Sequence, residues 1–222
     1  MKNYEHIFFD LDGTLTDSKN GITKSVSYAL GTIGIIENDL DKLECFIGPP
    51  LYDAFMLYYQ MNEEQAHQLV QAYRIYYKKY GIFDNIVYPG VREMLIKMKK
   101  AGKKIYLTTS KPLLFANMIL EHFGLKEYFT GIYGATMDGK ISDKEGVLRL
   151  ALSNNMSIVL KDTVLIGDRM HDVEGARAVG IEIFIVDYGY GTEEEFVIYP
   201  PDQRFQSCAS LTDFILLGGN YA

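Results

Sequence analysis

Cysteine is scarce in this chain of 222 residues, which contains only Cys45 and Cys208, far apart in sequence. Two distant cysteines form neither a disulfide framework nor a cluster of metal ligands, and such scarcity is typical of the reducing cytoplasm. No apolar run approaches the length of a membrane span. Acidic residues from Glu5 onward also make the N-terminus unlike a secretory signal. We therefore expect a cytoplasmic protein with no membrane partner.

Basic residues are outnumbered, with 22 Lys and Arg against 29 Asp and Glu, and the formal net charge is −7. The lack of a basic excess argues against a nucleic-acid partner held by a broad basic face. An anionic substrate would have to be captured by local donors and a cation. The chain has no repeat or low-complexity segment, and its hydrophobic fraction of 48% is enough for a sizeable core.

Short apolar runs alternate along the chain with stretches of helical periodicity. This alternation predicts an α/β fold in which helices cover a parallel sheet. Ligands of such sheets bind beyond the carboxyl ends of the strands, so the residues that follow each run are the candidates for a site. The expected strands are Ile7–Phe9, Ile105–Leu107, Ile132–Tyr133, Val164–Ile166 and Ile183–Val186.

The alternation stops between residues 17 and 88, where the pattern is helical and no strand-like run occurs. Gly48-Pro49-Pro50 separates two of the expected helices, and Tyr88-Pro89-Gly90 closes the stretch. A helical insertion here either forms a cap over the turn after the first strand or simply packs on the sheet. The expected helices are Lys19–Ile33, Asp39–Phe46, Leu51–Tyr59 and Glu63–Tyr80.

The sequence Asp10-Leu11-Asp12-Gly13-Thr14 directly follows the first apolar run. A continued strand places both carboxylates on one side of the pleat, where they repel unless one holds a proton or a cation lies between them. Gly13 permits a positive φ or a close backbone approach. This arrangement is typical of a metal ion beside a nucleophilic carboxylate, although a polar turn that ends a strand has a similar composition.

Three further segments hold candidate ligands for an anion or a cation. Thr109-Ser110 follows the second run, where hydroxyls and N–H groups at a helix start can bind phosphate, or serve only as an N-cap. Lys144 lies at the start of another helical pattern, where the helix dipole disfavours a positive charge. It either reaches a phosphate or Asp10, or is a solvated surface residue. Asp168 and Asp172 form a second acidic pair that suits Mg²⁺, directly and through water.

Together and in this order, these motifs resemble those of the haloacid dehalogenase superfamily, and specifically its phosphatases with a helical cap. Asp10–Thr14 matches the first motif, Thr109-Ser110 the second, and Asp168 with Asp172 the fourth. Lys144 matches the third, with Lys111 as a competing candidate. The resemblance covers nearly the whole chain. It implies a Rossmann-like core of residues 1–16 and 89–222, with a helical cap domain at residues 17–88.

The resemblance also implies a mechanism and a cofactor. Asp10 would attack phosphorus to form an aspartyl-phosphate, while Asp12 would protonate the leaving oxygen and then deprotonate water. The implied cofactor is Mg²⁺, whose ligands would be Asp10, the backbone carbonyl of Asp12, Asp168 and, through water, Asp172. The implied phosphate ligands are Thr109, Ser110 and Lys144.

Within the superfamily, Phe46–Leu51 and Tyr88–Val91 are similar to the phosphoglycolate-phosphatase and 5′-nucleotidase-like branch. That branch implies hydrolysis of a small soluble phosphorylated metabolite by a monomer or homodimer. The cap residues expected to choose the substrate are Gly48, Pro49, Pro50 and Leu51. A phosphosugar mutase keeps Asp10 and Asp12 and is the alternative function. A non-catalytic binding module is disfavoured, because every charged motif position holds a competent residue.

Overall fold

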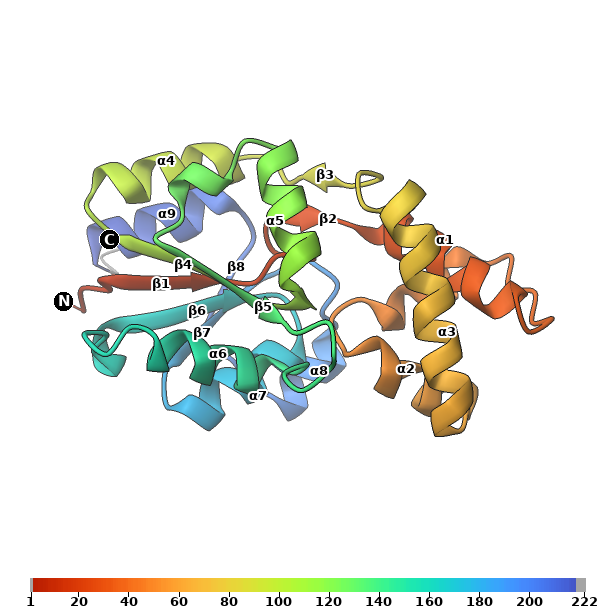
Figure 1. Ribbon diagram of the computed structural model, residues 1–222. Helices are drawn as coiled ribbons and strands as arrows, with labels where there is room; N and C mark the ends of the chain where they lie inside the picture. Colours follow the sequence, from red (N-terminus) through yellow and green to blue (C-terminus); the bar gives the residue numbers. More distant parts are fainter. Residues whose placement is uncertain (1, 219–222) are drawn as a thin grey trace. The chain divides into compact units, whose positions relative to one another are not determined.

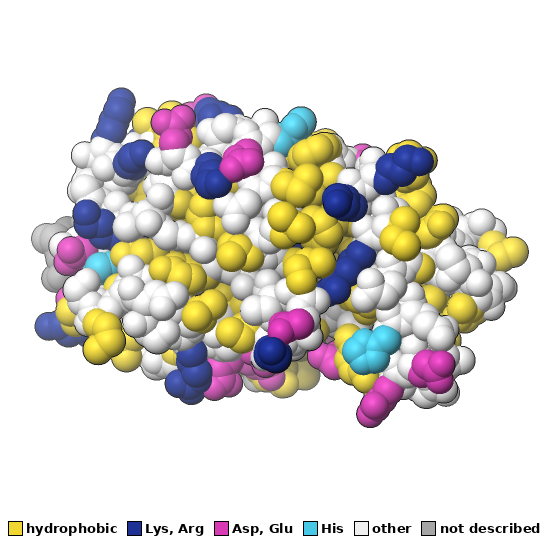
Figure 2. All heavy atoms as spheres, viewed as in Figure 1, with side chains coloured by type: hydrophobic (Ala, Val, Ile, Leu, Met, Phe, Trp, Pro, Cys, Tyr) yellow, Lys and Arg dark blue, Asp and Glu magenta, His cyan; other side chains and the backbone are white. Residues whose placement is uncertain are grey.

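The computed structural model describes residues 2–218, which form two compact units (Figure 1). The first unit consists of the residues up to Thr16 together with those from Val87 onward, and the second is Asp17–Ile86. Among the described residues, none of the helices is both long and apolar enough to cross a bilayer. On the face drawn in Figure 2, Lys and Arg side chains are scattered among acidic and apolar ones rather than gathered into a broad basic surface.

The first unit is an α/β sandwich built on one parallel sheet. Its strands are β1 (His6–Phe9), β4 (Lys104–Pro112), β5 (Gly131–Ala135), β6 (Thr163–Gly167), β7 (Glu182–Val186) and β8 (Gln203–Phe205). Its helices are α4 (Val91–Lys100), α5 (Leu113–His122), α6 (Lys144–Ser153), α7 (Met170–Val179), α8 (Glu193–Ile198) and α9 (Cys208–Leu217). The strand order is β5-β4-β1-β6-β7-β8, and α4 and α9 lie on one face of the sheet while α6 and α7 lie on the other (Figure 1). The predicted Rossmann-like α/β fold is thereby confirmed.

Strand β1 occupies the middle of the sheet because both of its faces are apolar. All four of its residues are buried, and Phe8 packs edge-on against Tyr106 of β4. Parallel strands covered on both faces have this kind of continuous apolar run. Phe9 is in register with Leu107 on one side and with Ile166 on the other. Asp10, the continuation of β4 from Thr108, and Gly167 at the end of β6 therefore lie side by side at the same edge of the sheet.

The five expected strands are all present in this sheet, and a sixth was not expected. Strand β8 has only three residues, of which Gln203 and Arg204 are exposed. It pairs with β7 at the edge of the sheet. A short edge strand with one buried side chain leaves no apolar run in the sequence.

The second unit is helical, with α1 (Lys19–Gly31), α2 (Leu51–Tyr59) and α3 (Glu63–Tyr76), and α3 packs against both of the others. The expected helix at residues 39–46 is a 3₁₀ helix, and the last expected helix passes into a π-helical turn at Tyr77–Gly81. The expectation of no strand in residues 17–88 is wrong. The two-residue strands β2 (Thr16–Asp17) and β3 (Ile86–Val87) pair with each other, and they are too short to produce a periodic pattern.

Turn residues define the start of two helices in this unit. Gly48 has φ of 110°, a conformation that glycine adopts without strain, and Pro50 then precedes α2. Asn62 and Gln65 form a capping box at the start of α3, in which each side chain accepts the backbone N–H of the other. These local signals fix the ends of helices that the apolar pattern alone leaves uncertain by a few residues.

Candidate active site

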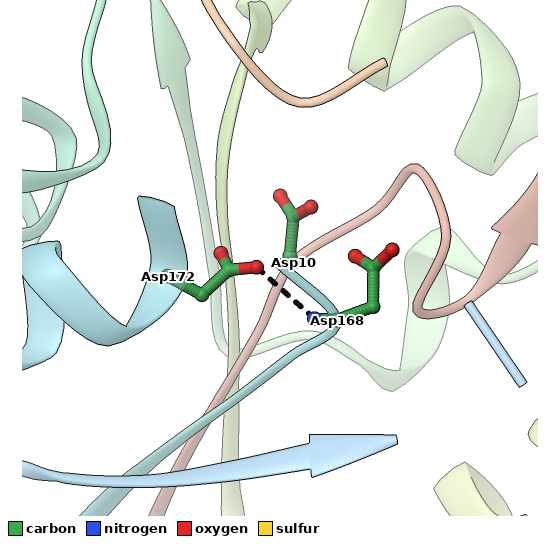
Figure 3. A group of neighbouring side chains, drawn as sticks. All are labelled: Asp10, Asp168 and Asp172. Atoms are coloured by element: carbon green, nitrogen blue, oxygen red, sulfur yellow. Dashed lines mark hydrogen bonds between the residues drawn. The ribbon is translucent and has the colours of Figure 1, made fainter. Parts of the chain in front are cut away.

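Three carboxylates meet at the edge of the sheet where β1 and β6 end. Asp10 follows β1, Asp168 follows β6, and Asp172 lies in the first turn of α7. Figure 3 shows their carboxylate groups gathered around one space. One oxygen from each lies within 4.8 Å of the others, and all three side chains are buried. Like charges so close together in a protein interior require compensation.

Backbone groups hold the two later carboxylates in place. Oδ2 of Asp172 accepts the N–H groups of Asp168 at 3.0 Å and of Arg169 at 3.1 Å. Oδ2 of Asp168 accepts the N–H of Tyr190 at 2.8 Å, and Oδ1 lies 3.2 Å from the hydroxyl of Thr14. Asp168 thus lies in the segment before α7, which begins at Met170, and Asp172 lies in the first turn of that helix.

Two glycines are required for this packing. Gly13 has φ of 82°, and a Cβ on it would lie 2.0 Å from Oδ2 of Asp168. A Cβ on Gly167 would lie 2.3 Å from Cγ of Asp172. Both distances are shorter than any real contact, so the carboxylates fit only because these positions lack side chains.

Lys144 compensates the cluster from the start of α6. Its Nζ lies 2.6 Å from Oδ1 of Asp10, 2.8 Å from Oδ1 of Asp172 and 2.8 Å from the carbonyl oxygen of Thr108. Burial would lower the pKa of Lys144, but the charges of Asp10 and Asp172 and the hydrogen bonds to them together raise it. Lys144 is thus a buried ammonium group rather than the solvated surface lysine that its sequence position also allowed.

Lys111 pairs with a different carboxylate. Its Nζ lies 2.9 Å from Oδ2 of Asp12, and both side chains are buried. Its backbone N–H donates to the hydroxyl oxygen of Thr109 at 3.2 Å. Because that hydroxyl oxygen accepts this bond, its own proton can point toward a ligand. The two lysines therefore contact different carboxylates, and Lys144 is the one that contacts Asp10.

The charges of this cluster do not cancel. Four buried carboxylates, those of Asp10, Asp12, Asp168 and Asp172, face the ammonium groups of two lysines, while Arg169 is paired with Glu195 at 2.7 Å. Desolvation raises the pKa of Asp10 to about 6, and desolvation together with the charges of Asp172 and Asp10 raises that of Asp168 well above its usual range. Acidic side chains outnumber the ammonium groups at the site, and their hard oxygen donors fit a divalent cation such as Mg²⁺.

The remaining predicted residues divide between the two units. Thr109 is buried and Ser110 is half-buried at the end of β4, in the first unit. The segment Gly48–Leu51 belongs to the second unit, ahead of and at the start of α2. Sequence reasoning missed the Tyr190 N–H as a partner of Asp168. The only signal was glycine, since a Cβ on the neighbouring Gly189 would lie 2.3 Å from Cβ of Asp168.

The chain is similar in sequence and in structure to several known proteins. The family model described as haloacid dehalogenase-like hydrolase matches residues 7–186. The chain is 41% identical to a 5′-nucleotidase of Pseudomonas aeruginosa over 94% of each chain. It is 38% identical to tyrosine-protein kinase PtkA of Mycobacterium bovis, over 83% of this chain and 62% of that protein. The crystal structure of a predicted phosphatase from Clostridium acetobutylicum matches with a TM-score of 0.93 and 43% identity, over 97% of this chain and 99% of that one. The chain belongs to the haloacid dehalogenase-like hydrolase family.

A metal-binding test follows from the charge excess. Adding Mg²⁺ to chelator-treated protein should raise its Tm, because an ion that binds only the folded state at 100 times its Kd adds about 2.7 kcal/mol. The pKa of Asp10 in the folded protein, about 6, lies above the ordinary value of 3.8 for an aspartate. In metal-free protein the ionisation of Asp10 therefore lowers stability as the pH rises between those values. A proton therefore competes with the ion at about pH 5 but not at about pH 7.5, and the gain in Tm should be smaller at the lower pH.

Scanning calorimetry at both pH values measures this gain. Asp168→Asn should lose most of it, whereas Asp213→Asn, on the exposed face of α9, should keep it. An equal rise in Tm at both pH values, or in wild type and Asp168→Asn alike, would show that the ion binds elsewhere.

Proposed function

We propose that this chain is a Mg²⁺-dependent phosphatase that hydrolyses a small soluble phosphate monoester, of phosphoglycolate or nucleotide type, through an aspartyl-phosphate on Asp10. The observation that carries the proposal is the environment of Asp10. Its buried carboxylate is oriented by Lys144 at 2.6 Å and shares one space with Asp168 and Asp172. As a member of the haloacid dehalogenase-like hydrolase family, the chain is a phosphoric monoester hydrolase.

The reaction has two steps that use the same two carboxylates. In the first, an Asp10 oxygen forms a bond to phosphorus while the ester P–O bond breaks, and Asp12 gives a proton to the leaving oxygen. In the second, Asp12 takes a proton from water, the water oxygen bonds to phosphorus, and the bond to Asp10 breaks. The products are the free alcohol and inorganic phosphate, and both carboxylates return to their starting state.

The other residues of the site neutralise charge. Lys144, Thr109 and Ser110 are proposed to donate to phosphoryl oxygens as negative charge develops on them. The acidic residues would hold Mg²⁺ through Asp10, Asp168 and the backbone carbonyl of Asp12, with Asp172 acting through water. When bound, the ion supplies charge neutralisation for the nucleophile and the phosphoryl group.

Two other phosphoryl transfers define the alternatives. A phosphosugar mutase would use Asp10 and Asp12 and return the phosphoryl group to the sugar, so it would release no phosphate. Because one relative is named a tyrosine-protein kinase, the second alternative is transfer of a phosphoryl group from a nucleotide to a tyrosine hydroxyl. Release of inorganic phosphate from a panel of phosphate monoesters in the presence of Mg²⁺ separates hydrolysis from both.

Replacing the nucleophile should stop turnover. Asp10→Asn is nearly isosteric but lacks a competent nucleophile, and loss of a covalent nucleophile lowers kcat by several powers of ten, about 10⁴-fold or more. The measurement is steady-state phosphate release on the best substrate of the panel, with Asp213→Asn as the matched control. If Asp10→Asn kept more than about a tenth of the wild-type rate, Asp10 would not be the nucleophile.

We also propose that the helical unit is a cap that governs the choice of substrate, through the segment Gly48–Leu51. Pro49→Gly loosens this segment without adding a side chain. It should change the ranking of substrates by kcat/KM more than the kcat on the best one, because contacts to the leaving group act on specificity. A uniform fall for every ester of the panel would make the segment a general closure element instead.

A further inference from the structure

The carboxylate of Asp12 is hydrogen-bonded on one side only. Its Oδ2 lies 2.9 Å from Nζ of Lys111. Its Oδ1 is buried and has no hydrogen-bond partner among the described residues. Leaving a buried acceptor unpaired is costly, so such atoms are rare in folded proteins and are often found where a ligand or a reacting group binds.

Lys111 is well placed to fix this orientation. Its side chain is only 5% exposed, and burying an ammonium group is favourable only when it is paired. It extends from the end of β4, and its backbone N–H donates to the hydroxyl oxygen of Thr109 in the same strand. The backbone of Lys111 is therefore bonded to one of the expected phosphate ligands, while its ammonium group contacts Asp12.

The two buried lysines have separate partners. Lys144 contacts Asp10, Asp172 and the carbonyl of Thr108, whereas the carboxylate at the Lys111 ammonium group is that of Asp12. Removing Lys111 therefore changes the surroundings of Asp12 and leaves the contacts of Lys144 with Asp10 intact. This separation allows the contribution of Lys111 to be measured by itself.

We propose that Lys111 is a positioning residue for Asp12: it holds Oδ2, so that Oδ1 is the atom that exchanges the proton with the leaving oxygen. The inference rests on the proposed function and specifies an atom within it. As the ester P–O bond breaks, the proton on Oδ1 passes to the leaving oxygen, and Lys111 keeps its own proton. The carboxylate left behind is stabilised by the adjacent ammonium group.

This role makes a prediction that depends on the leaving group. An alkoxide leaves poorly unless it is protonated, whereas p-nitrophenolate is stable as an anion and needs no proton. Loss of Lys111 should therefore lower kcat/KM, which reports the steps up to departure of the leaving group, for an alkyl phosphate and leave kcat/KM for p-nitrophenyl phosphate nearly unchanged. A lysine that bound the phosphoryl group, or that only supported the fold, would affect both esters alike.

The test compares Lys111→Met with wild type on p-nitrophenyl phosphate and on the best alkyl phosphate of the panel. We expect kcat/KM on the alkyl ester to fall by about 10²-fold, the range of general acid catalysis, and kcat/KM on the aryl ester to change only a few-fold. Lys140→Met is the matched control, because the side chain of Lys140 is 83% exposed. Lys111→Arg, which keeps a positive charge, should recover part of the alkyl rate.

Equal falls in kcat/KM on the two esters, or no fall on either, would overturn the inference. Should Lys111→Met fail to fold, Lys111→Gln, which keeps a polar group, takes its place in the same comparison. Asp10→Asn in the same assays distinguishes failure of the proposed function from failure of the proposed role of Lys111. If Asp10→Asn remains active, the proposed function fails; if Asp10→Asn is inactive and Lys111→Met shows no contrast between the esters, only the role of Lys111 fails.

Discussion

The mutual repulsion of four carboxylates buried at one edge of the sheet is the constraint on which the site depends. Desolvation and like charge raise the pKa values of Asp10 and Asp168, and only two ammonium groups face the cluster. A protein does not keep such a cluster for stability, because apolar residues of the same volume would pack better there. The cluster is instead a preformed site that fits a divalent cation.

The fold brings these groups together because the sheet is parallel and β1 lies in its middle. Phe9 at the end of β1 is in register with Leu107 of β4 and Ile166 of β6, so the residues that follow these positions share one edge. Glycines at positions 13 and 167 let the backbone approach the carboxylates, and Lys144 enters from the first turn of α6. Rigid secondary structure therefore fixes the geometry of the charged groups, which is what electrostatic catalysis requires.

Much of this could be predicted from the sequence, because it depends on neighbouring residues. The apolar runs identified the central strands, and Asp10 and Asp12 followed directly from one of them. The direction in which Lys144 points from α6 depends on tertiary packing. The sequence therefore left open whether Lys144 contacts the site or lies in solvent. The pairing of Lys111 with Asp12, the N–H of Tyr190 on Asp168, and the edge strand β8 join distant segments and leave no periodic signal.

The central claim is that Asp10 carries the phosphoryl group during turnover. Enzyme mixed with excess substrate and Mg²⁺, quenched in acid during the steady state and reduced with borohydride, converts an aspartyl-phosphate into homoserine. Mass spectrometry of the peptides should then find homoserine at position 10, and only in samples that received substrate. Homoserine at another aspartate, or an unmodified Asp10 in enzyme that is turning over, would contradict the account.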